Sequence, residues 1–182
     1  FLHNQGFHGE DMVIAVLDGG FTDVDINPAF DSLWSNNQIL GTWDFVTRSP
    51  LGFDKHKHGS QVLSIMGANL PGKFIGSAPK AGYYLLRTEN AVSEYPEEEE
   101  NWISAAEFAD SAGVDLINSS LSYTVFNDST MNHRIEDLDG NTTRITRAAD
   151  IAASKGILVV ASAGNKGAAD WHFIGATADA AS

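Results

Sequence analysis

Three short, mostly apolar runs constrain the fold of this chain more than any other feature. They are VIAVL at 13–17, VDLIN at 114–118 and ILVV at 157–160, and each is followed by small or polar residues. Runs that are apolar on both faces and stop at a turn are typical of buried strands. Burial on both faces is the rule in parallel sheets. The runs therefore predict a parallel sheet.

A helical pattern precedes each of the last two runs. Apolar residues recur at helical spacing over 102–109 and over 145–152, and each pattern closes at a glycine. Helix, glycine and strand in that order, twice, indicate βαβ units. A further helix is expected from His58 and a further strand at 83–86. We predict an α/β fold with a mostly parallel sheet and helices on both faces.

Charge and composition exclude several classes of protein. The chain has 24 acidic and 11 Lys or Arg residues, a net charge of -13, which disfavours nucleic acid and anionic membranes as partners. It has no cysteine, so it can form neither disulfides nor thiolate metal sites. No apolar run reaches the ~18 residues that span a bilayer, and no signal peptide is recognisable, so we expect no membrane insertion and a Phe1 that is not a natural start.

Polar side chains follow the predicted strands, at the end where parallel sheets bind ligands. Asp18 follows the first run, serines follow the second, and Asn165 follows the third closely. A carboxylate after five apolar residues needs a hydrogen-bond donor, and His58 is the candidate. An Asp partner would fix the tautomer of an imidazole that acts as a general base.

The order of these motifs resembles that of the subtilases, the subtilisin-like serine proteases (peptidase family S8). The motifs are Asp-Gly-Gly at 18–20, His-Gly-Ser at 58–60 and Ala-Gly-Asn at 163–165. The segments GFHGEDMVIAVLDGGF, GSAP and VDLINSSLSY also look like subtilase segments in the expected order. The resemblance covers nearly all of the chain.

The resemblance implies a role for each matching residue. Asp18 would orient His58, His58 would act as general base and acid, and the Asn165 amide would donate to the oxyanion. The segment after the second run would pair with an extended peptide, and the segment before Asn165 would line the pocket for the residue before the scissile bond. The substrate-binding residues implied are Ser120, Leu121, Ser122, Tyr123, Ser162, Ala163 and Gly164. Ser122 stands where the family usually has glycine.

The family's nucleophile lies in a Gly-Thr-Ser-x-Ala-x-Pro segment that does not occur in these 182 residues. We therefore expect residues 1–182 to be an incomplete subtilase catalytic domain, truncated at its C-terminal end. The intact protein would be a secreted or cell-envelope endopeptidase that acts on polypeptides. The chain alone is expected to be inactive and, with its sheet cut short, to self-associate.

An alternative function stays open: a non-catalytic peptide-binding α/β module, or pseudoprotease. No metal site is expected, because Pro28 stands where an EF-hand-like loop needs glycine and two histidines at i and i+2 share no helix face. The chemistry requires no cofactor, and a structural calcium ion is left open although no motif indicates one. Glu97 to Glu100 is expected to be a solvated surface segment at the start of a helix, or else an acidic rim that favours basic substrate residues.

Overall fold

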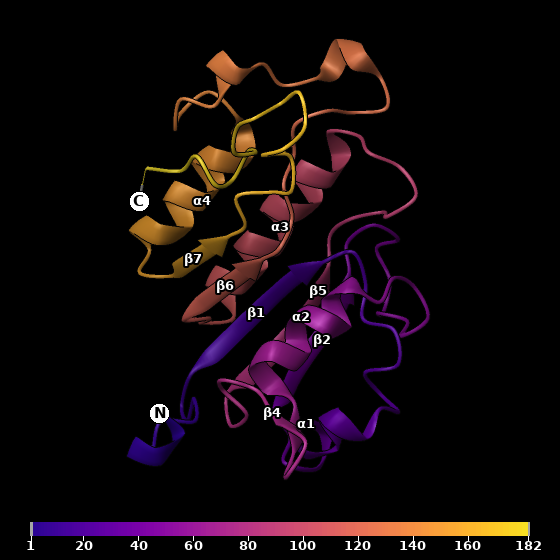
Figure 1. The fold of residues 1–182 in the computed structure, drawn as a ribbon, viewed down its shortest axis with the longest axis vertical. Helices are drawn as coiled ribbons and strands as arrows, with labels where there is room; N and C mark the ends of the chain where they lie inside the picture. Colours follow the sequence, from indigo (N-terminus) through magenta and orange to yellow (C-terminus); the bar gives the residue numbers. More distant parts are fainter. Residues whose placement is uncertain (1, 182) are drawn as a thin grey trace.

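The computed structural model describes residues 2–181 and contains one five-stranded sheet in which all neighbouring strands are parallel. The strands run in the order β2-β5-β1-β6-β7, so the first strand in the chain lies in the middle (Figure 1). Their bounds are β1 Val13–Asp18, β2 Ile39–Asp44, β5 Gly82–Arg87, β6 Leu116–Ser119 and β7 Leu158–Ala161. A separate two-stranded ribbon pairs β3 Asn69–Leu70 with β4 Phe74–Ile75.

Helices cover both faces of the sheet, which confirms the predicted α/β class. Their bounds are α1 Asp31–Ser35, α2 His58–Gly67, α3 Glu97–Ser111 and α4 Arg144–Ser154. Successive residues of a strand point to opposite faces, and β1 follows this rule. Ala15 and Leu17 pack in one core with α3 and α4, whereas Ile14 and Val16 pack in the other with α1 and α2. No helix within residues 2–181 combines the length and apolar character needed to cross a membrane.

The predicted strands exist, but two of them start later than their apolar runs. The run at 114–118 becomes a strand only at Leu116, because the Asp115 carboxylate accepts a hydrogen bond from the Val13 N–H at 2.8 Å. The last strand likewise begins at Leu158 and ends at Ala161. Strand β2 was not predicted, since its sequence, ILGTWD, contains a glycine and lacks a clear alternation.

The prediction that Glu97 to Glu100 is a solvated surface segment was wrong for two of its four residues. The segment forms the first turn of α3, where Glu98 and Glu99 are buried. The polar loop after β6 accounts for the burial of Glu99, because its His133 lies against that side chain, with Nε2 and Oε1 2.6 Å apart. Helical periodicity places every residue of one face toward a neighbour, whatever its charge.

Strand β7 lies at an edge of the sheet among the described residues. Its Leu158 and Val160 side chains are 60% and 44% exposed. An edge strand with exposed aliphatic side chains favours association, so self-association stays a prediction for this chain.

Candidate functional site

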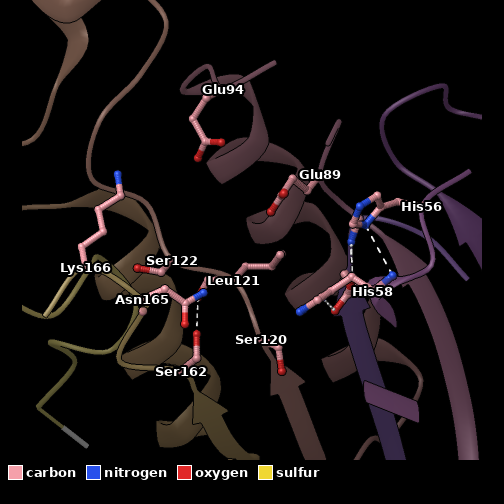
Figure 2. A pocket seen from close by; sticks show the side chains of 13 residues that line it. His56, His58, Glu89, Glu94, Ser120, Leu121, Ser122, Ser162, Asn165 and Lys166 are labelled. Carbon is pink, nitrogen blue, oxygen red and sulfur yellow. Dashed lines mark hydrogen bonds and ion pairs between the residues drawn. The ribbon is translucent and has the colours of Figure 1, made fainter. Parts of the chain in front are cut away.

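A cavity of about 250 Å³ opens at the carboxyl ends of β1, β6 and β7, and we call it the strand-end cavity. It collects side chains from segments far apart in the sequence (Figure 2). The residues that line it are Asp18, Gly19, His56, His58, Glu89, Glu94, Ser120, Leu121, Ser122, Ser162, Gly164, Asn165 and Lys166.

Asp18 and His58 form a hydrogen-bonded pair in this cavity, as the sequence predicted. The Nδ1 atom of His58 lies 2.9 Å and 3.0 Å from the two carboxylate oxygens of Asp18. Asp18 is fully buried, while the His58 side chain is 43% exposed. Because Nδ1 faces the carboxylate, the other ring nitrogen, Nε2, is free to meet a reacting group.

The electrostatics of the pair reflect its burial. Burial raises the pKa of the Asp18 carboxyl, and the nearby His58 opposes part of that effect. The Gly19 N–H also opposes it by donating to Oδ1 at 2.7 Å. Arg87 fixes the turn that holds this N–H, because its Nε donates to the Gly19 carbonyl at 3.0 Å and its guanidinium pairs with Asp44 at 2.8 Å.

Two glycines allow the start of α2 to approach the end of β1. A Cβ on Gly59 would lie 2.5 Å from the Gly20 carbonyl oxygen and 2.9 Å from the Asp18 Cβ. A Cβ on Gly20, whose φ is +153°, would lie 2.5 Å from the backbone nitrogen of His56. Neither contact is tolerable for a real side chain. The glycines beside the acid and the base are therefore what permits the pair to form.

Asn165 lies across the cavity from His58 (Figure 2). It lies in the segment after β7, which ends at Ala161, and the Ser162 N–H ties this segment to β6 by donating to the Ser119 carbonyl at 3.0 Å. The Ser162 hydroxyl also donates to the Leu121 carbonyl at 3.1 Å. These bonds hold the two predicted substrate-binding segments, 120–123 and 162–164, side by side.

Two of the predicted substrate-binding residues lie outside the lining of the cavity. Tyr123 is fully buried, and its carbonyl accepts from the Ala176 N–H at 2.9 Å. Ala163 does not line the cavity either, although its neighbours Ser162 and Gly164 do. The other five predicted residues, Ser120, Leu121, Ser122, Ser162 and Gly164, all line it.

The sequence did not place Glu89, Glu94, Lys166 or His56 in this cavity, although all four line it. Glu89 follows the end of β5, so the same strand-end argument that found Asp18 could have found it. Burial, followed by repulsion from Glu94 and Asp18, raises the pKa of Glu89 to about 7. Burial also raises the pKa of Glu94, and Lys166 opposes that rise. His56 is exposed but lines the cavity, and its Nδ1 accepts from the His58 N–H at 3.4 Å.

Glu98 lies behind this part of the cavity and predicts a pH-dependent stability. It is 3% exposed, and its Oε2 has no hydrogen-bond partner among the described residues. Burial, then repulsion from Glu94 and Glu89, raises its pKa from 4.5 to about 8. Between these two values the folded chain keeps a proton that the unfolded chain releases. The free energy of unfolding therefore falls as pH rises through this window.

We expect Glu98→Gln to remove much of this dependence. The variant should match the wild type near pH 4 and be more stable by roughly 2 kcal/mol at pH 8, as judged by urea unfolding at both pH values. Glu97→Gln is the matched control, because Glu97 is the exposed neighbour in the same helical turn. An equal pH dependence in the wild type and Glu98→Gln would contradict the assignment.

Within residues 2–181, no group of three or more His, Asp or Glu side chains is arranged to hold a metal ion. The arrangement instead pairs a buried carboxylate with an imidazole, opposite a neutral amide. That set of groups can move a proton and stabilise a developing negative charge.

The chain is similar to proteins of known family. The sequence profile of the subtilase family matches residues 9–180. Subtilisin E from Bacillus subtilis (strain 168) is 28% identical over 169 residues, which cover 91% of this chain and 37% of that protein. Subtilisin Savinase from Lederbergia lenta is 28% identical over 168 residues, covering 91% and 52%.

Solved structures show the same fold. The crystal structure of MycP1 without its N-terminal propeptide matches with a TM-score of 0.60 and 23% identity, over 90% of this chain and 46% of that one. A lanthipeptide protease matches with a TM-score of 0.61 and 24% identity, over 91% and 43%. The chain spans about half of the length, or less, of these relatives.

Proposed function

The chain belongs to the subtilase family, and from that premise we propose that it supplies the acid, base and oxyanion-binding groups of a serine endopeptidase. The observation that carries the proposal is the Asp18–His58 pair, which shares one cavity with Asn165. A carboxylate that holds an imidazole by Nδ1 leaves Nε2 as a base, and this is the arrangement that activates a serine hydroxyl.

In the proposed reaction His58 transfers a proton, Asn165 stabilises the oxyanion, and Asp18 supports His58. Nε2 of His58 takes the proton of a serine hydroxyl as its oxygen attacks the peptide carbonyl carbon. The Asn165 amide donates to the negative oxygen that forms, and His58 then passes the proton to the leaving amine. Water then attacks the acyl-enzyme. His58 takes a proton from the water and returns it to the serine oxygen, while Asn165 again donates to the negative oxygen. Asp18 stays ionised and stabilises the imidazolium.

The proposed substrate is an extended polypeptide. We place its pairing along the backbone of Ser120–Ser122, which lines the cavity, and not at Tyr123, whose carbonyl is already bonded to Ala176. Main-chain pairing of this kind makes binding tolerant of sequence, and pockets for alternate side chains add selectivity. The chemistry uses no cofactor. A secreted or cell-envelope location of the intact protein remains a prediction.

We further propose that the nucleophilic serine lies in a part of the full-length protein outside these 182 residues. The purified chain should then neither hydrolyse a denatured protein nor react with a fluorophosphonate probe, because His58 and Asn165 have no serine to activate. Mass spectrometry after labelling measures this directly.

The full-length protein gives the complementary test. It should incorporate one fluorophosphonate and hydrolyse a denatured protein, and labelling should abolish the hydrolysis. Labelling of the 182-residue chain at Ser60 or Ser162 would contradict the proposed position of the nucleophile. A full-length protein that binds peptides but neither cleaves them nor reacts would instead support a pseudoprotease.

A further inference from the structure

The hydroxyl of Ser122 lies where two glycine backbones approach it from different segments. A Cβ added to Gly164 would lie 2.6 Å from the Ser122 Oγ. A Cβ added to Gly175 would overlap the same oxygen even more closely. Both glycines therefore pack their Cα atoms against this side chain, and no space is left between them and Ser122 for another group.

Backbone hydrogen bonds hold the three segments in this arrangement. The Ala176 N–H donates to the Tyr123 carbonyl at 2.9 Å, and the Gly175 N–H donates to the Ala163 carbonyl at 3.3 Å. The Ser162 hydroxyl completes the set by donating to the Leu121 carbonyl at 3.1 Å. Each residue next to Ser122 in sequence is thus bonded to a facing segment. The backbone that carries the Ser122 side chain therefore cannot withdraw from the facing segments without breaking these bonds.

The Ser122 side chain that packs against these glycines is part of the lining of the strand-end cavity. Ser122 and Gly164 both line it, together with His58 and Asn165. Figure 2 shows Ser122 beside Asn165 and Lys166, on the side of the cavity away from His58. A peptide that lies along Ser120–Ser122 with its carbonyl near Asn165 would direct the side chain before the scissile bond between segments 120–122 and 162–164. That is where the Ser122 hydroxyl already fills the gap.

We propose that Ser122 is a specificity-determining residue that restricts the protease to small side chains, such as those of glycine, alanine and serine, immediately before the scissile bond. The inference rests on the proposed function, because it assumes that the cavity binds a peptide for cleavage. A phenyl ring would have to displace the hydroxyl against the Gly175 backbone, and a packed interior resists such insertion. A methyl group can stay in the open part of the cavity.

The test compares peptides that differ only in the residue before the scissile bond, with the full-length protein as the enzyme. Wild-type kcat/KM should be about tenfold or more higher for alanine than for phenylalanine. Ser122→Gly removes the hydroxyl and its Cβ, so it should raise kcat/KM for the phenylalanine peptide by about tenfold or more. The ratio of kcat/KM for the phenylalanine peptide to that for the alanine peptide should therefore rise by about tenfold or more in this variant.

Two further variants keep the test decisive. Ser122→Ala retains the Cβ and loses only the hydroxyl, so it should give an intermediate ratio and serves if the glycine variant folds poorly. The φ of Ser122 is not positive, so alanine fits the backbone at this position. Ser129→Gly is the control for the flexibility that glycine adds, because Ser129 is exposed in the loop after β6. It should leave the ratio of the two peptides unchanged.

The outcomes separate this inference from the proposed function. A wild-type enzyme that cleaves both peptides but prefers phenylalanine would overturn the role of Ser122 and leave the protease assignment intact. So would folded Ser122→Gly and Ser122→Ala variants whose preference equals that of the wild type. A full-length protein that cleaves no peptide and reacts with no fluorophosphonate would overturn both.

Discussion

In the full-length protein, Asp18→Asn is expected to lower kcat by about 10⁴. The Asp18 carboxylate accepts from Nδ1 of His58 at 2.9 Å, and this places the imidazole lone pair on Nε2. An asparagine amide can donate to Nδ1 instead, which favours the tautomer whose Nε2 already carries a proton. Such an imidazole cannot accept the serine proton. Steady-state hydrolysis of a peptide substrate measures the loss.

Asp25→Asn is the matched control for this experiment. Asp25 is exposed in the loop after β1, outside the strand-end cavity, so the same chemical change there should leave kcat within about twofold. The melting temperatures of both variants must be measured as well. If Asp18→Asn lost its activity only because it unfolded, or if it kept most of its activity, the proposed role of Asp18 would be wrong.

Asn165→Ala should lower kcat by about 10² to 10³ with little change in KM. The neutral amide donates to charge that exists only in the transition state, so its removal does not weaken binding of the ground state. The alanine variant retains the backbone of the segment after β7. Kinetics with one peptide over a range of concentrations separate kcat from KM.

Asn141→Ala provides the comparison, because Asn141 is an exposed loop residue outside the strand-end cavity. It should leave both kinetic constants within about twofold of the wild type. A fall in the stability of Asn165→Ala equal to its fall in activity would indicate that Asn165 serves the turn after β7. A rise in KM with unchanged kcat would place it in substrate binding rather than in transition-state stabilisation.

The fold could be predicted from the sequence to the level of class and strand type. The run at 13–17 is buried on both faces in the structure, as its uninterrupted apolar character required. Strand β2 was missed because its sequence contains a glycine and its apolar pattern is weak. Strand boundaries were missed where a side chain replaced a backbone partner, as Asp115 does for the Val13 N–H.

Site residues could be predicted from the sequence only when they stand next to a recognisable strand or helix pattern. Asp18 ends a buried strand and His58 begins a helix next to a glycine, so sequence order alone brought both to the carboxyl edge of the sheet. Glu94 was missed because it sits in no comparable pattern, whereas Glu89 follows the end of β5 and could have been found by the strand-end argument. Their proximity to Asp18 arises from the placement of β5 beside β1, a contact between segments about 70 residues apart.

By itself the sequence determined the parallel α/β class and the order of the motifs, and it singled out Asp18, His58 and Asn165 as candidates. The class follows from local periodicity, and the pairing of Asp18 with His58 follows from the need of a buried carboxylate for a donor. The role proposed for Asn165 came from the resemblance to the subtilases. Only the tertiary structure decided that Glu98 is buried, that Tyr123 is bonded to Ala176, and that the Ser122 hydroxyl fills the space beside Gly164 and Gly175. Burial and shape depend on which distant segments pack together, and a glycine gives no sign in the sequence of the side chain that occupies the space it leaves.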